Sequence, residues 1–315
     1  MTTIASSISQ RQETTMPPPH PLLTVMAWEA RRLRASPVLW IAPLLLFGLF
    51  VADFWPARNP LGFGYDTPEG QFIGHVAGTS ALGLVDLLTQ RLFLLLVLLL
   101  PFVSADGVAR DWKRRTHELL MTTTLPNWAY VWGRYFIVLL LSLGAALVLL
   151  ATLLALGFVL PLVDATIFPA PQVGTIVTLW AVMIVPATIL ISSLSFALGT
   201  WLPHRSTLVK IGVLLVWLAV AGVFVVLPDN GTTTAPWYLL FDPTSNGRSV
   251  VVINQFRSIS APTSIDQGWP FIYALEQRLP DLGTWIASQV LWVGIGLTSV
   301  LVVALAFQRF RNALR

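Results

Sequence analysis

The chain contains no cysteine and little charge. None of its 315 residues is Cys, and only 11% are Asp, Glu, Lys or Arg. The absence of cysteine excludes disulfides, thiolate metal sites and cysteine nucleophiles. A soluble domain carries about 25% charged residues, whereas 55% of this chain is hydrophobic and its mean hydropathy is +0.73. The composition therefore predicts a membrane protein whose surroundings are mostly lipid.

Motifs for nucleotide binding and metal-dependent catalysis are also missing. The sequence has no G-x-x-x-x-G-K-[ST] phosphate loop, so we expect no ATP binding of that kind by this chain. His117-Glu118 is not followed by a second histidine four residues after the first, and the remaining histidines are scattered along the sequence. The net charge of +4 is too small to suggest nucleic-acid binding. We expect the chain itself to be neither an enzyme nor a metal or cofactor carrier.

Six apolar runs are long enough to cross a membrane, which takes about 20 mostly apolar residues. They occupy residues 37–55, 82–104, 134–160, 173–202, 208–227 and 285–307. We therefore predict an all-α membrane protein whose transmembrane domain fills residues 37–315 with six helices. The second run is the weakest, because Asp86, Gln90 and Arg91 fall in its first half.

The distribution of positive charge predicts the orientation. Most of the 19 Lys and Arg residues lie before the first run, between the second and third, between the fourth and fifth, or after the sixth. Such segments are normally cytoplasmic. We expect a multi-pass protein of the cell (cytoplasmic) membrane with both termini in the cytoplasm.

The residues before the first run divide into two parts. Residues 1–21 are rich in Ser, Thr, Gln and then Pro, which predicts a disordered cytoplasmic tail. Residues 22–36 alternate apolar side chains with Glu29, Arg31, Arg32 and Arg34 at helical spacing. We predict an amphipathic helix lying in the membrane interface. The alternative is a simple positively charged anchor before the first span.

Several polar features inside and between the runs allow two interpretations each. Arg91 and Asp86 either line a pathway or form a structural ion pair whose arginine reaches the outer headgroups. The fourth run carries Pro186, expected to kink it, and Thr and Ser residues that favour helix packing over a substrate role. Residues 228–283 are long for a membrane loop, so we expect an extracytoplasmic segment that is partly folded outside the membrane or dips back into it, rather than an unstructured loop.

The segment between the second and third runs is the most informative. Residues 106–136 are patterned like a short helix followed by a capped turn, and they concentrate positive charge on Arg110, Lys113, Arg114 and Arg115. A basic helix between two spans is expected to face the cytoplasm. Together with the missing phosphate loop, it indicates a surface that binds a cytoplasmic partner.

Three stretches carry a likeness to a known family. They are WEARRLRASP at residues 28–37, ARDWKRRTHELL at 109–120 followed by Leu125-Pro126 and Gly133-Arg134-Tyr135, and LWVGIGL at 291–297 with Arg309-Phe310 after an Asp242-Pro243 element. In these stretches the chain resembles the membrane (permease) subunit of ABC-2 type ABC transporters. It departs from the family pattern where Arg115 replaces a Gly, Leu125 precedes Pro126 and Arg134 replaces a Lys.

The resemblance implies a coupling helix, roughly residues 107–120, that docks in a groove of a separate ATP-binding subunit. The residues implied in docking are Arg110, Lys113, Arg114, Glu118, Leu119 and Leu120, with a smaller contact at His204 and Arg205. ATP and Mg²⁺ would belong to that subunit, and a second permease subunit would complete the unit within the bilayer. Asp86, Gln90 and Arg91 would lie near the pathway or the dimer interface.

The expected function is export of a hydrophobic or amphipathic substrate. The sparse charge of the predicted spans disfavours a dedicated ion relay. The alternative is a non-transporting membrane anchor or scaffold of an ATPase-containing complex, which would use the same docking helix.

Overall fold

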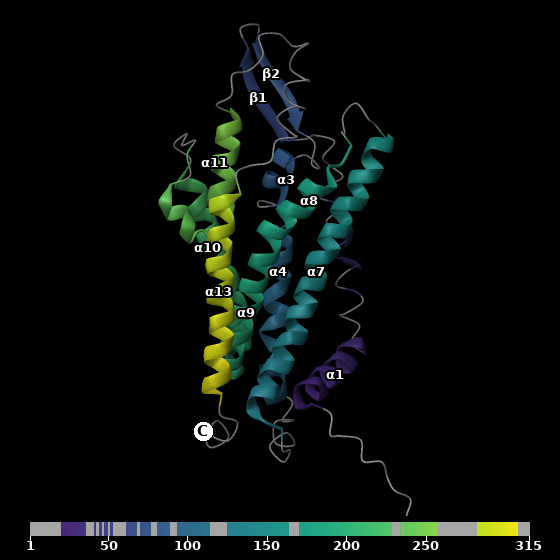
Figure 1. Cartoon of the computed structure of the whole chain (residues 1–315), viewed down its shortest axis with the longest axis vertical. Coiled ribbons are helices and arrows are strands. Elements are labelled where there is room, and N and C mark those ends of the chain that lie inside the picture. Colours follow the sequence, from purple (N-terminus) through teal and green to yellow (C-terminus); the bar gives the residue numbers. More distant parts are fainter. Residues whose placement is uncertain are drawn as a thin grey trace, which may run out of the picture.

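The described part of the chain is a bundle of long helices. The computed structural model describes residues 20–35, 41, 44–45, 47–49, 51–52, 61–67, 70–76, 81–88, 93–113, 125–163, 170–228, 234, 236–257 and 282–307. Figure 1 shows a β-hairpin beyond one end of the bundle and the short helix α1 lying across the other end.

Among the described residues, four helices are long and apolar enough to cross a membrane. They are α7 (Asn127–Val163), the continuous helix Val173–Trp201, the helix Pro203–Val226 and α13 (Gly283–Ala306). The second of these is built from α8 (Val173–Leu179), η3 (Trp180–Ile184) and α9 (Val185–Trp201), and the third from η4 (Pro203–Arg205) and α10 (Ser206–Val226). They overlap the third to sixth predicted spans.

The first two predicted spans are described only in part. Within residues 37–55, positions 41, 44–45, 47–49 and 51–52 are helical, and the other positions lie outside the described residues. In the second run, 82–104, the structure describes α3 (Ala81–Leu87), the helical residue Leu88 and α4 (Phe93–Ser104). Residues 89–92, which include Gln90 and Arg91, lie outside the described residues, so a single continuous span here stays a prediction.

Helix α9 lies at the centre of the bundle. It packs against α4, α5 (Asp106–Lys113), α7, α10 and α13. Its hydroxyl side chains Thr188, Ser192, Ser193 and Ser195 are fully buried. Ser192 Oγ donates to the Thr188 carbonyl over 2.7 Å, and Ser193 Oγ lies 2.8 Å from Tyr135 Oη of α7. Burial and these bonds favour the packing interpretation of the stripe.

A π-helical turn precedes the proline of the central helix. η3 occupies Trp180–Ile184, and Pro186 follows in the first turn of α9. Proline has no N–H to donate and crowds the preceding turn, which a π-type turn accommodates. Trp180 Nε1 donates to the Ala146 carbonyl over 2.8 Å, so the widened turn is bonded to α7.

The β-hairpin was not predicted from the sequence. Strand β1 (Leu61–Thr67) pairs antiparallel with β2 (Gly70–Val76), with Thr67 opposite Gly70 at the turn. In Figure 1 the hairpin extends beyond the end of the bundle opposite α1. The described chain is therefore mostly helical, and the all-α prediction needs this correction.

The connection between α10 and α13 is structured where it is described. It contains the 3-10 helix η5 (Trp237–Phe241) and α11 (Asn246–Arg257), in agreement with a partly folded segment. Asp242 is fully buried between them. Its carboxylate accepts hydrogen bonds from the Thr244 N–H at 2.9 Å, the Thr244 hydroxyl at 2.6 Å and the Gly247 N–H at 2.9 Å. Burial raises the pKa of this carboxyl, and the bonds from Thr244 and Gly247 oppose the rise.

Asp242→Ala is expected to lower the free energy of unfolding by about 1–3 kcal/mol, because it leaves buried donors at the start of α11 without an acceptor. The measurement is a thermal melt of the purified chain followed by size-exclusion chromatography. Ser249→Ala is the matched control, since the Ser249 hydroxyl bonds to the Ser245 carbonyl four residues back in the same segment. Equal melting temperatures for the Asp242 variant and wild type would contradict the capping role.

Candidate functional site

Three helices converge at the end of the bundle where α1 lies. α1 (Pro21–Arg34) fills the position of the predicted amphipathic helix, and it packs against α7. The contact is close, because a Cβ added at Gly133 would lie 2.8 Å from Val25 Cγ1. α5 packs on α7 as well. The first turns of α7 are thus covered by α1 and α5.

Asp111 of α5 and Arg134 of α7 form a buried ion pair. Arg134 Nη2 lies 2.5 Å from Asp111 Oδ2, and the two side chains are 1% and 3% exposed. Tyr130 Oη donates to the same carboxylate oxygen over 2.7 Å. Arg134 Nη1 donates to the Gly107 carbonyl at the start of α5. One arginine therefore holds both a side chain and the backbone of α5.

Glu29 and Arg32 of α1 extend this pair into a four-charge cluster. Arg32 Nη1 lies 3.3 Å from Glu29 Oε2 and 3.8 Å from Asp111 Oδ1, and Arg134 Nη2 lies 4.0 Å from Glu29 Oε2. Glu29 is 4% exposed. Two carboxylates and two guanidinium groups balance one another, so these four residues carry no net charge. We call Glu29, Arg32, Asp111 and Arg134 the charge cluster.

Aromatic rings cover the cationic side of the cluster. The Arg134 guanidinium lies 4.6 Å from the Tyr130 ring centre and 5.3 Å from that of Trp28, while Arg32 lies 5.6 Å from the Trp28 ring. A cation over an aromatic face is attracted more strongly when water is excluded. Burial lowers the pKa of the Arg32 guanidinium, and the nearby Glu29 carboxylate opposes the change.

The cluster fixes the relative orientation of α1, α5 and α7 more than it adds net stability. A buried ion pair gains little over an apolar pair of equal volume, but removing one partner is strongly destabilising. The relative positions of α1, α5 and α7 are therefore fixed by a contact that costs several kcal/mol to break.

α5 also lies beside η4, the turn between α9 and α10. Lys210 Nζ of α10 lies 2.7 Å from Asp106 Oδ2 at the start of α5, and 5.6 Å from the Phe102 ring centre. The two segments implied in docking are therefore neighbours in space, although about ninety residues of sequence separate them.

The predicted docking residues fall into three groups. Arg110 is half-buried on α5, and His204 and Arg205 are exposed on η4. Lys113 is the last residue of α5, and its side chain is outside the described set. The remaining four, Arg114, Glu118, Leu119 and Leu120, lie outside the described residues. The docking assignment stays a prediction.

The predicted pathway residues are not brought together in the described part of the chain. Asp86 lies in α3, without a described side chain, and Gln90 and Arg91 lie outside the described residues. Among the residues that can be searched, no group of three or more His, Asp or Glu side chains could hold a metal ion.

Sequence reasoning did not single out Asp111, nor the pairing of Glu29 and Arg32 with Arg134. One local signal was present: Tyr130 and Arg134 are four residues apart, so both face the same side of a helix. Asp111 likewise shares a face of α5 with Gly107 and Val108, which are buried. A carboxylate on the apolar face of a short helix indicates a buried partner.

Comparison with known proteins adds no relative: no protein-family model and no curated protein matches this chain. The functional conclusion therefore depends on the sequence motifs and on the geometry of the charge cluster.

Proposed function

We propose that this chain is the membrane subunit of an ATP-driven transporter, an exporter of a hydrophobic or amphipathic substrate. In this proposal a separate ATP-binding subunit holds ATP and Mg²⁺, and a second permease subunit completes the pathway. The observation that carries the proposal is the charge cluster, which joins the short helix α5 to the transmembrane helix α7 and to α1. A short helix fixed in this way can pass on a displacement applied from outside the membrane.

The mechanism follows from the cost of breaking the cluster. A force on α5 that separated Asp111 from Arg134 would leave charges buried without partners. Moving α5, α1 and the start of α7 together costs less, so the three helices are expected to shift as one body. Rigid-body movement of packed elements is a common route from a binding event to a large conformational change.

The ATPase would contact the outer surface of α5, the residues that follow it, and η4. Arg110 and Arg205 are basic residues of this surface with described side chains, and Glu118, Leu119 and Leu120 would add an acidic group and an apolar pair. The apolar pair would fill a groove on the partner and the charges would set the register. The positive charge on this side also supports a cytoplasmic orientation of the surface.

Combining Glu118→Arg with Leu119→Asp is expected to abolish co-purification with the ATP-binding subunit that the proposal requires. The measurement is affinity purification of the tagged chain after co-expression, with quantification of bound ATPase. The matched control is Arg31→Glu, a charge reversal at an exposed position of α1. Retention of the ATPase by the double variant, with the control also unchanged, would refute the docking surface.

ATP hydrolysis distinguishes a transporter from a membrane scaffold. For a transporter, we expect the reconstituted complex to hydrolyse ATP faster when amphipathic substrates are added, and Arg110→Glu to reduce that stimulation. A scaffold would bind the ATPase equally well but show no stimulation by any substrate.

A further inference from the structure

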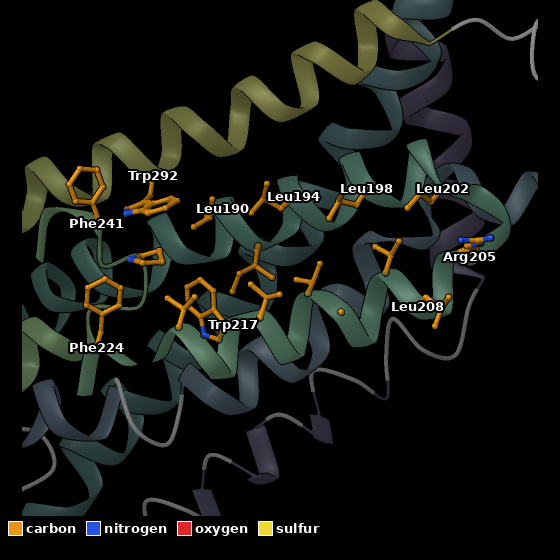
Figure 2. A pocket seen from close by; sticks show the side chains of 17 residues that line it. Leu190, Leu194, Leu198, Leu202, Arg205, Leu208, Trp217, Phe224, Phe241 and Trp292 are labelled. Atoms are coloured by element: carbon orange, nitrogen blue, oxygen red, sulfur yellow. The ribbon is translucent and has the colours of Figure 1, made fainter. Parts of the chain in front are cut away.

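An apolar groove runs along α9 and α10. It has a volume of about 580 Å³ and is lined mainly by Leu and Val side chains of these two helices. Figure 2 shows Leu190, Leu194, Leu198 and Leu202 in a row along α9, with α10 alongside. The helix Pro203–Val226 is the least buried of the four long apolar helices of the described chain.

One end of the groove is positively charged. Of the 17 described residues that line it, Arg205 alone is charged. In Figure 2 it stands at one end of the row beside Leu202 and Leu208, whereas Phe224, Phe241 and Trp292 stand at the other end. Among the described residues, no carboxylate lies within ion-pair distance of the Arg205 side chain.

Arg205 is the last residue of η4, which leads directly into α10. Its side chain is exposed. An exposed guanidinium therefore lies where the apolar groove begins.

We infer that this groove binds an anionic glycerophospholipid from the leaflet at the η4 end of the bundle. The phosphate would bind to Arg205, and one acyl chain would lie along Leu202, Leu208, Val209 and Gly212. The hydrocarbon core is about 30 Å thick, and at 1.5 Å per residue one leaflet corresponds to about ten residues of α10. That distance leads from Arg205 to Val216, within the groove.

A lipid fits the groove better than a second copy of this chain. The lining is apolar along its length and basic at its membrane-boundary end, which matches an anionic headgroup above an acyl chain. A second copy of α10 would bring its own Arg205, and like charges in contact are unfavourable. The inference is separate from the proposed transport function, except that it assigns Arg205, at the edge of the proposed ATPase surface, to the lipid phosphate.

The test is native mass spectrometry of the purified full chain, titrated with palmitoyl-oleoyl phosphatidylglycerol or phosphatidylcholine. We expect one tightly bound phosphatidylglycerol per chain and weaker binding of phosphatidylcholine. Arg205→Gln should weaken phosphatidylglycerol binding about ten-fold, the lower end for loss of a charge-assisted hydrogen bond. Arg205→Lys should restore most of the affinity, because a lysine also binds phosphate.

Gly212 provides a second variant that acts on the acyl chain and not on the headgroup. A Cβ at Gly212 meets no atom within 4 Å, so Gly212→Phe should fill the groove without displacing the backbone. It is expected to weaken binding of both lipids. Gly222→Phe is the matched control, because Gly222 lies on the same helix in equally open space but does not line the groove.

Three results would overturn the inference. The first is equal phosphatidylglycerol binding by wild type and Arg205→Gln. The second is an equal effect of Gly212→Phe and Gly222→Phe. The third is a dimer that dissociates on Gly212→Phe while lipid binding stays at the wild-type level, which would assign the groove to a second copy. Thermal melts of all four variants must match wild type for these comparisons, and Gly212→Leu is the substitute if Gly212→Phe does not fold.

Discussion

Asp111→Ala is expected to lower the free energy of unfolding by about 3–5 kcal/mol, the usual cost of leaving a buried charge without its partner. Arg134 is 1% exposed, so water cannot replace the lost carboxylate unless the helices separate. Tyr130 loses the carboxylate acceptor of its hydroxyl hydrogen in the same variant. The expected result is a large fall in melting temperature in detergent, measured by size-exclusion chromatography after heating.

A double variant separates the ion pair from the packing around it. Asp111→Leu combined with Arg134→Met replaces the two charges with apolar side chains, and we expect it to recover most of the stability that Asp111→Ala loses. If the cluster transmits motion from α5 to α7, a complex that contains this double variant should still show no substrate-stimulated ATP hydrolysis. A wild-type melting temperature for Asp111→Ala would show that the pair does not hold α5 on α7.

Gly199→Ala is the second change with a large expected effect. A Cβ at this position would overlap the carbonyl oxygen of Ala105 and lie 2.8 Å from Ala105 Cα. Ala105 links α4 to α5, and the clash is with backbone, which cannot rotate away. We expect a loss of about 1–3 kcal/mol, typical of overpacking, and a smaller folded fraction after extraction from the membrane.

The control for this variant is Gly144→Ala in α7. A Cβ at Gly144 meets no atom within 4 Å. Replacing an exposed helix glycine with alanine stabilises by up to about 1 kcal/mol, so Gly144→Ala should melt at or slightly above the wild-type temperature. Equal stabilities for Gly199→Ala and Gly144→Ala would show that the close approach of α9 to Ala105 does not stabilise the fold. A chemical denaturation series at fixed detergent concentration would measure the free energy of unfolding of each variant.

The long apolar helices could be predicted because length and hydropathy determine them locally. A run such as 134–160 has no charged residue after Arg134, so a single sequence is enough to predict a helix in lipid. The structure places α7 at 127–163, beginning at Asn127 directly after Pro126, the expected turn. Helix ends outside the apolar region were less well predicted, because packing at the membrane boundary determines them.

The hairpin was missed because its strands lack a clear sequence pattern. β1 contains Gly62 and Gly64, and β2 contains Gly70 and Gly74, so neither strand shows a clear alternation of apolar and polar side chains.

The charge cluster shows the limit of reasoning from one sequence. The charged residues can be identified in the sequence, and Glu29, Arg32 and Arg134 lie in the stretches that carry the family resemblance. Their partners could not be deduced, because α1, α5 and α7 are joined by tertiary contacts and not by sequence spacing. Arg110 was favoured as a docking residue over its neighbour Asp111, since exposed positive charge is easier to read than a single buried carboxylate.

The central place of α9 has a consequence for how the protein is made. α9 contacts α4, α5 and α7, which leave the ribosome before it, and α10 and α13, which leave it later. The hydroxyl groups that α9 buries and the close approach at Gly199 form only when these helices surround it. The helices synthesised first therefore have no finished interior to join. The charge cluster can join α1, α5 and α7 before α9 is made, but the packed interior around α9 is complete only after α13 has been synthesised.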